Sequence, residues 1–266
     1  MTPFKLTREL TLIDLAVAMS DRQTLGLADV HLGFEEALHR DGALVPRGHL
    51  TIIQERLRGI ADALGISAER PWDRLVINGD LRHQFGPFTA QEWTHIRQFL
   101  GHFLDLFETI VLVQGNHDGD LDVLAREFPR VEVQPRAQLG RTLFWHGDAD
   151  PGEIPADVDT LVIGHDHPAI RLRDPVTGRM ELFKCFLTGA YAERTLVVLP
   201  SFNPWTAGSD LTQERPLSPV LNEVDLASMT VYLVSDQHEI FPFGALGRLM
   251  PQNAGPSSTL DARTDG

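Results

Sequence analysis

Five short segments of the sequence concentrate the residue types that bind divalent metal ions. Carboxylates, amide oxygens and imidazoles without a thiolate suit Mn²⁺, Fe or Zn²⁺ better than copper(I) or an iron–sulfur cluster. One such pair alone would be a weak signal, but five in order predict a metal-dependent site. In chain order the segments are Asp29-Val30-His31, Gly79-Asp80, Gly115-Asn116-His117-Asp118, His146-Gly147-Asp148 and Gly164-His165-Asp166-His167.

Apolar runs precede these segments and place them at the ends of predicted strands. Residues 24–29, 74–78, 109–114, 142–145 and 160–163 are such runs. Open α/β sheets bind ligands at the carboxyl ends of their strands. In an extended chain, side chains two residues apart point the same way, so Asp29 should align with His31, and His165 with His167. Asp80 stands alone on its loop, a position suited to bridging two ions.

The elements between the first three runs predict a parallel sheet. Residues 48–64 place apolar side chains three and four apart, which is typical of a helix, and residues 89–107 begin with the capping-box pattern Thr89-x-x-Glu92. Strands that alternate with helices pair in parallel through right-handed crossovers. Short strands dominate the second half and predict a second, more mixed or antiparallel sheet packed on the first. They are residues 131–133, 142–145, 160–163, 182–187, 195–199 and 231–234.

Composition limits the location and the partners of the protein. The 266 residues carry a formal net charge of -14 and a single cysteine, Cys185, which excludes an intrachain disulfide. We find no signal peptide and no run long enough to span a membrane, so we expect a cytoplasmic protein without a membrane partner. An acidic chain is a poor general binder of duplex DNA. We expect residues 1–250 to form the domain and residues 251–266, rich in Pro, Gly and Ser, to be a disordered tail.

The ordered segments resemble the calcineurin-like metallophosphoesterase superfamily, whose pattern is Asp-x-His, Gly-Asp, Gly-Asn-His-Asp/Glu, His and Gly-His-x-His. All five blocks are matched, between residues 29 and 167. The resemblance implies an α/β fold, a four-layer αββα sandwich in which two mixed sheets are flanked by helices. It also implies a centre of two divalent metal ions between the sheets.

The resemblance further implies a role for each position. One ion would be held by Asp29, His31 and His167, the other by Asn116, His146 and His165, and Asp80 would bridge them. His117 would be the catalytic histidine near the leaving group, and Asp118 either its orienting partner or a group behind the ligands. His83 and Arg82 are candidates for substrate contact. The alternatives are a hydrogen bond within its own loop for His83, and a solvated loop position for Arg82.

Further segments are similar to the stand-alone SbcD-related group, which includes the ligase-associated DNA damage response endonucleases called PdeM. The similarity covers residues 24–210 and includes Gly79-Asp80-Leu81-Arg82-His83, Lys184-Cys185-Phe186 and Leu199-Pro200-Ser201-Phe202-Asn203. A protein serine/threonine phosphatase would continue Gly-Asp with an aromatic-Val-Asp-Arg-Gly run, which is absent here. The resemblance implies DNA-repair partners and a homodimer.

These observations predict a Mn²⁺-dependent phosphodiesterase, with Fe or Zn²⁺ as alternative metals and a nucleic acid or nucleotide as substrate. A phosphomonoesterase or small-nucleotide pyrophosphatase is the alternative that the acidic charge keeps open. A non-catalytic module that uses its metals to dock a partner is a third hypothesis. The histidine at position 117 argues against it, because a structural role alone would not require that residue.

Overall fold

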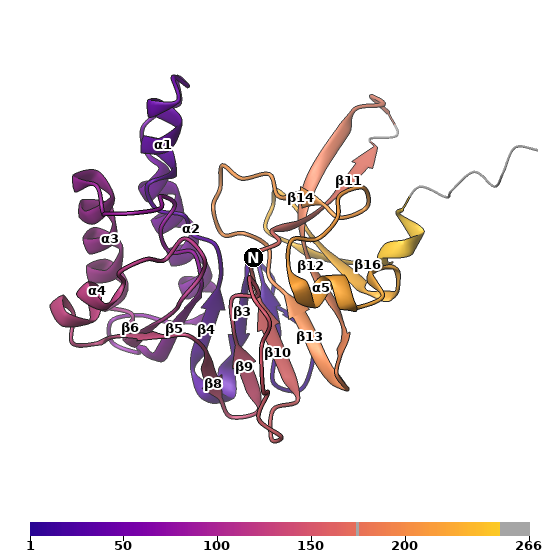
Figure 1. The fold of residues 1–266 in the computed structure, drawn as a ribbon, viewed down its shortest axis with the longest axis horizontal. Helices are drawn as coiled ribbons and strands as arrows, with labels where there is room; N and C mark the ends of the chain where they lie inside the picture. Colours follow the sequence, from indigo (N-terminus) through magenta and orange to yellow (C-terminus); the bar gives the residue numbers. More distant parts are fainter. Residues whose placement is uncertain (174–175, 251–266) are drawn as a thin grey trace, which may run out of the picture.

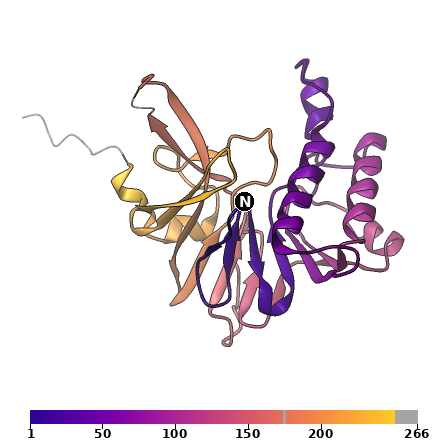
Figure 2. The same ribbon diagram turned by 180° about the vertical axis from the view of Figure 1, so that it is seen from behind.

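The computed structural model describes residues 1–173 and 176–250. Figures 1 and 2 show two β-sheets in the middle of the molecule, with helices α1 to α4 beyond the first sheet and α5 beyond the second. This is the predicted αββα order of layers. The predicted tail, residues 251–266, lies outside the described residues.

The first sheet, in the part of the chain that the structure describes, has seven strands in sequential order. β4 to β7 pair in parallel, as predicted for the βαβ units, whereas β1 to β4 pair antiparallel through short turns. The strands are β1 (Phe4–Lys5), β2 (Thr11–Ile13), β3 (Ala16–Met19), β4 (Thr24–Leu27), β5 (Trp72–Asn78), β6 (Phe107–Val113) and β7 (Val131–Gln134).

One strand that was predicted for the second sheet belongs to the first sheet. Residues 131–133 were expected in the second sheet, but β7 pairs in parallel with β6, where Val131 lies opposite Ile110. The short helix α4 (Asp122–Glu127) provides a further crossover after β6, so the chain adds one more parallel strand before it changes sheets.

Both predicted helices form on the outer face of the first sheet. α2 (His49–Leu64) buries Ile53, Leu57 and Ile60. α3 (Ala90–Phe103) begins with the predicted capping box, in which the Thr89 hydroxyl accepts from Glu92 N and the Glu92 carboxylate accepts from Thr89 N. α3 is shorter than predicted, because residue 107 already starts β6. α1 (Phe34–Arg40) and the 3₁₀ helix η1 (Ser20–Arg22) complete the first half.

The second sheet is mixed, as predicted. β10 pairs in parallel with β9 and β13, whereas β12 pairs antiparallel with β11, β13 and β15. Its described strands are β8 (Ala137–Leu139), β9 (Thr142–Phe144), β10 (Thr160–Ile163), β11 (Pro168–Arg173), β12 (Met180–Tyr191), β13 (Arg194–Val198), β14 (Ser209–Asp210), β15 (Thr230–Val234) and β16 (Ile240–Ala245). Its outer face is covered by α5 (Pro219–Glu223) and the 3₁₀ helices η2 (Leu226–Ser228) and η3 (Leu246–Arg248).

The two sheets pack closely at a glycine of β4. A Cβ atom at Gly26 would lie 2.6 Å from Cε1 of Phe144 on β9 and 3.1 Å from Cγ2 of Val17, so a larger residue would force the sheets apart. Leu27 of β4 lies opposite Ile77 of β5, which in turn lies opposite Leu112 of β6. The carboxyl ends of these strands are therefore in line, and the loops that follow them begin at one edge of the sheet.

Candidate metal centre

Every predicted metal-ligand segment lies in a loop after a strand. Asp29 and His31 follow β4, Asp80 follows β5, and residues 115–118 follow β6. His146 follows β9 and the pair 165 and 167 follows β10, so the second sheet supplies the rest. Parallel pairing of Ala28 with Ser201, and the hydrogen bond from Asp29 N to Gly79 O (3.1 Å), join these loops to one another.

The backbone at the site differs from the extended one expected. Five candidate ligands have positive φ angles although they are not glycine, an uncommon conformation that concentrates at functional sites. Asp29 and His31 nevertheless lie in one cluster, as expected. The second pair is divided, because His167 joins the cluster of Asp29 and His31 whereas His165 joins that of Asp80. The five are Asp29 (57°), His31 (51°), Asp80 (52°), His165 (71°) and His167 (47°).

The first cluster contains Asp29, His31 and His167. His167 Nε2 lies 3.2 Å from Asp29 Oδ1 and 3.3 Å from His31 Nε2. His31 Nδ1 contacts Arg82 O at 3.2 Å, so Nδ1 donates to that carbonyl and leaves Nε2 free as a ligand. Three donor atoms that face one another at these distances could hold one cation.

The second cluster contains Asp80, His146 and His165, with Asn116 beside them. His146 Nε2 lies 3.4 Å from Asp80 Oδ2 and 3.2 Å from Asn116 Oδ1. His146 Nδ1 donates to Asn78 O (3.1 Å), which again leaves Nε2 free. The donors are two imidazoles, a carboxylate and an amide oxygen, the set that the sequence predicted.

Asp80 lies between the two clusters. Its Oδ2 is 3.4 Å from His146 Nε2, 3.7 Å from His31 Nε2 and 3.9 Å from His117 Nε2. Burial raises the pKa of its carboxyl, but hydrogen bonding to and attraction by His146 outweigh this effect and hold the pKa well below the usual range. Burial in turn lowers the pKa of His31 to about 3. The ionised carboxylate of Asp80 and the neutral imidazole of His31 are the forms that bind metal. Burial lowers the pKa of His146, but its hydrogen bond to Asp80 and attraction by Asp29 outweigh this effect and raise the pKa to about 10, so a metal ion there would displace a proton.

Two glycines give the ligands room. A Cβ atom at Gly79 would collide with the His146 ring, and one at Gly115 would collide with the Asp80 carboxylate. Gly79 also has a φ of 85°, which disfavours any other residue. Gly79 and Gly115 are thus required by the close packing of the candidate ligands.

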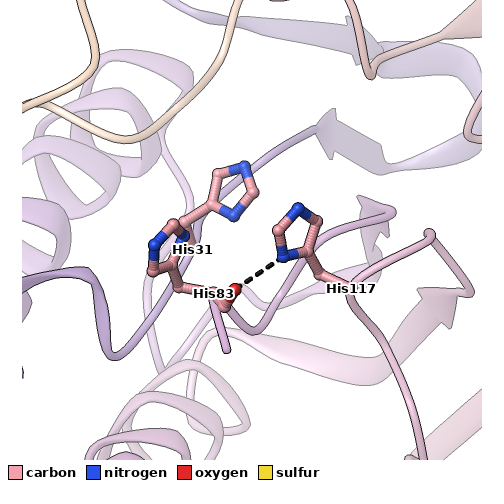
Figure 3. A group of neighbouring side chains, drawn as sticks. All are labelled: His31, His83 and His117. Carbon is pink, nitrogen blue, oxygen red and sulfur yellow. Dashed lines mark hydrogen bonds between the residues drawn. The ribbon is translucent and has the colours of Figure 1, made fainter. Parts of the chain in front are cut away.

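His117 lies beside the clusters, between two aromatic rings. Figure 3 shows it with His31 and His83, and its Nδ1 donates to His83 O at 2.5 Å. Its ring stacks on His83 (centroids 5.7 Å apart, 16° between planes) and on Phe85 (4.1 Å, 29°). This bond directs Nε2 away from the loop and toward Asp80. His83 also forms a third possible metal-binding group with His31 and His117, so the structure brings this candidate into the site.

Asp118 does not orient His117, which corrects one of the two roles expected for it. Its carboxylate accepts from Gly115 N (3.0 Å), Arg82 N (3.1 Å) and Leu81 N (3.4 Å). Burial and the neighbouring Asp80 carboxylate raise its pKa to about 7. Asp118 therefore ties the loop after β5 to the loop after β6, which is the other role expected, behind the ligands.

The expected contact of Arg82 with substrate is wrong, and so is the solvated alternative. The side chain is fully buried and forms an ion pair with Glu92 of α3 (Nη2 to Oε2, 3.0 Å). Its guanidinium also donates to Gly119 O and Gly86 O, both at 2.9 Å, and lies 3.8 Å from the centre of the Phe88 ring. The sequence could not show this ion pair, because the Thr89-x-x-Glu92 pattern already assigned the Glu92 carboxylate to the capping box.

Two further residues at the site have roles that sequence reasoning missed. Asn78, the last residue of β5, donates through Nδ2 to Trp145 O (3.1 Å) and Val162 O (3.0 Å), and so joins the two sheets. Phe85 is 68% exposed and covers one face of His117. An asparagine at the end of an apolar strand and an aromatic residue in a loop were the available signals. Asn203 caps a turn, because its Oδ1 accepts from Trp205 N (3.0 Å).

The layers and the paired clusters define the metallophosphoesterase fold. The solved structure of the nuclease MPE from Pseudomonas putida is similar over 91% of this chain and 98% of that one, with 23% identity and a TM-score of 0.59. YfcE, a phosphoesterase from E. coli, aligns with 82% of this chain and 96% of its own (16% identity, TM-score 0.37). A protein of unknown function from Aquifex aeolicus aligns with 54% and 78% (20% identity, TM-score 0.32).

Sequence comparisons add no closer relationship. No protein-family model matches the chain, and no curated protein matches it. Within the described residues, no helix combines the length and the apolar character needed to cross a bilayer.

Proposed function

We propose that this chain is a two-metal-ion phosphoesterase that hydrolyses phosphodiesters, with Mn²⁺ as its metal and a nucleic acid or nucleotide as its substrate. The observation that supports this most directly is the pair of donor clusters on either side of Asp80. Asp29, His31 and His167 would hold one ion, Asn116, His146 and His165 the other, and Asp80 both. Two bound cations neutralise charge on the attacking and leaving oxygens of a phosphoryl group.

His117 is the residue placed to move a proton. Its Nδ1 donates to His83 O, which leaves Nε2 facing the clusters. In the imidazolium form of the ring, Nε2 carries the proton that is given to a leaving oxygen. The stacked rings of His83 and Phe85 restrict the orientation of the imidazole. We assign contact with the substrate to His83, because its ring lies beside that of His117.

Phe85 supports a substrate with a flat aromatic group. One face of its ring covers His117, yet 68% of the residue is exposed. Stacking of a base on an aromatic side chain contributes about 1–3 kcal/mol and tolerates any base. DNA is the first polymer to test, because the Pseudomonas putida protein that shares the fold is a nuclease.

The net charge of -14 favours a second candidate, a phosphomonoesterase or small-nucleotide pyrophosphatase. A small substrate releases few counterions, so its affinity would depend weakly on salt, whereas DNA affinity would fall steeply. A homodimer and DNA-repair partners remain proposals that rest on the sequence resemblance alone, as does a non-catalytic docking role.

The test compares hydrolysis of bis-p-nitrophenyl phosphate and p-nitrophenyl phosphate after reconstitution with Mn²⁺, Fe²⁺ or Zn²⁺. We expect diester cleavage to exceed monoester cleavage. We expect it to disappear in Asp80→Asn and to fall by about 10²–10⁴ in His117→Ala. Asp73→Asn, a matched change at an exposed carboxylate on β5, should keep full activity.

Three results would count against the proposal. Near-native turnover by Asp80→Asn with bound metal would show that the site is wrongly assigned. A preference for the monoester would favour the second candidate. Silence on both substrates with two ions bound would favour the docking role.

A further inference from the structure

A cavity of about 260 Å³ lies between the two halves of the molecule, and none of the candidate metal ligands lines it. α2 and the turn between β2 and β3 form one wall. The other walls are β12, the turn between β15 and β16, and residues 204–207. The polar side chains used below are Arg56, Lys184, Thr206, Asp236 and His238. We call this cavity the Lys184 pocket.

The charge of Arg56, which lines the pocket, is already paired with a carboxylate behind it. Asp14 is fully buried, and its carboxylate accepts from Arg56 Nε (2.6 Å) and Nη2 (2.5 Å). His238 Nδ1 lies 3.1 Å from the same carboxylate. The Asp14 carboxylate is therefore paired with Arg56 and His238, and the one carboxylate among the described residues that line the pocket, Asp236, is exposed. One cationic side chain of the pocket has no carboxylate partner in the part of the chain that the structure describes.

That cation is Lys184, one of only two lysines in the sequence. Its ammonium donates to Ser201 O (2.7 Å) and Asn203 O (2.5 Å), which uses two of three N–H groups. Among residues 1–173 and 176–250, no carboxylate forms an ion pair with it. Burial, followed by repulsion from Arg56, lowers its pKa to about 7. The ammonium form therefore lacks a compensating charge from the described residues alone. An anion beside it would stabilise that form, and the adjoining space has room for one.

We propose that the Lys184 pocket binds a small oxyanion of the phosphate class, with Lys184 as its counter-charge. Arg56, His238 and Thr206 also line the space, and the Arg56 guanidinium and the Thr206 hydroxyl carry further donor groups. Pockets for drug-sized ligands span roughly 300–1,000 Å³, so this volume suits a phosphate ion or a terminal phosphate group better than a whole nucleotide.

The pocket is connected to the metal clusters through the loop that Lys184 holds. Ser201 Oγ donates to Asp29 O (2.9 Å), and Asn203 N donates to the same carbonyl (3.1 Å). An anion that fixes Lys184 would therefore also fix the backbone behind Asp29. The proposal does not depend on the catalytic function proposed above, because the binding can be measured without turnover.

The two lysines allow a direct test. We would label full-length protein with ¹⁵N-lysine, load it with diamagnetic Zn²⁺, and follow the two side-chain ammonium resonances while inorganic phosphate is added. We expect a saturable shift at Lys184 and none at Lys5. The shift should persist in Asp80→Asn, which impairs the metal centre, and should weaken at least tenfold in Ala207→Trp, which narrows the mouth of the pocket at an exposed residue.

Calorimetric titration with phosphate gives an independent readout. Lys184→Met should abolish the site that Asp80→Asn keeps, and Lys5→Met is the matched control. Titration with a 5′-phosphorylated dinucleotide separates two ligands. If the dinucleotide binds as well as phosphate does, the pocket accepts a terminal phosphate group. If it does not bind, the ligand is the free ion. Phosphate binding that disappears only in Asp80→Asn, or no response at Lys184 in a folded protein, would overturn the proposal.

Discussion

At the residue scale, the site depends on side chains whose second polar atom is already engaged. His31, His117 and His146 each have Nδ1 at a backbone carbonyl, so one nitrogen of each ring is directed at the centre. The tautomer is thereby set by the protein and not by the ligand. His117 differs from His31 and His146 in its neighbours, because its ring stacks on those of His83 and Phe85.

Phe85→Ala tests whether the exposed ring contacts a base. We expect cleavage of an oligonucleotide to fall about 10-fold or more, since stacking contributes about 1–3 kcal/mol. An abasic nucleotide beside the scissile phosphate should lower the cleavage rate of the wild type by a similar factor. It should lower the rate of Phe85→Ala hardly further, because that variant has no ring to stack on the base. Phe243→Ala, at an exposed phenylalanine of β16, is the matched control. Equal loss on bis-p-nitrophenyl phosphate and DNA would assign Phe85 only to the positioning of His117.

At the element scale, one buried ion pair fixes two loops against a helix. Arg82 lies in the loop after β5, Glu92 lies in the first turn of α3, and Arg82 also reaches Gly119 in the loop after β6. Since His83 and His117 occupy these same two loops, the ion pair supports the position of His117, the histidine to which we assign the proton transfer. Asp118 reinforces it through backbone N–H groups from both loops.

Arg82→Met should lower the free energy of unfolding by about 3–5 kcal/mol, because it leaves the Glu92 carboxylate buried without its partner. Urea denaturation would measure the loss. Arg97→Met, also on α3, breaks an exposed pair with Glu127 of α4 and should cost less than about 1 kcal/mol. The double variant Arg82→Met with Glu92→Leu should recover part of the stability. A loss no greater than that of Arg97→Met would contradict the structural role.

At the scale of the whole molecule, the centre joins two halves of the chain. Asp29, His31 and Asp80 come from the first sheet, whereas His146, His165 and His167 come from the second. A cation held by both groups would bind only the folded chain and would link the sheets. Gly26 and Asn78 also join the two sheets, because Gly26 packs against Phe144 and Asn78 donates to Trp145 O and Val162 O.

Removal of metal with a chelator should therefore lower the melting temperature of the wild type. At a free metal concentration about 100 times Kd, binding contributes roughly 2.7 kcal/mol. Calorimetry with and without Mn²⁺ would measure the change in melting temperature. This change should be small in Asp80→Asn, because the variant lacks the carboxylate that lies between the clusters. A wild type whose unfolding ignores added metal would contradict a centre that spans both sheets.

The stability of the fold should also depend on pH through Lys184. Its pKa in the folded state is about 7, against 10.5 for the ordinary group, so between these values the unfolded chain binds a proton that the folded chain lacks. Stability should thus rise with pH in this window, by at most about 1.4 kcal/mol per pH unit. The stability of Lys184→Met relative to the wild type should be greatest below pH 7 and decline above it. Denaturation in buffers free of phosphate and sulfate would measure this. A difference that stays constant from pH 6 to 10 would contradict it.

The sequence by itself determined the strands before each ligand segment, the two long helices and the capping box, because local periodicity and capping carry that information. It also indicated the candidate ligands in order, since their residue types are distinctive. Only the tertiary structure decided that Arg82 is buried against Glu92, that Asp118 binds backbone and not His117, and that residues 131–133 extend the first sheet. These outcomes depend on which distant groups meet, and a buried charge takes its role from a partner that no local pattern identifies.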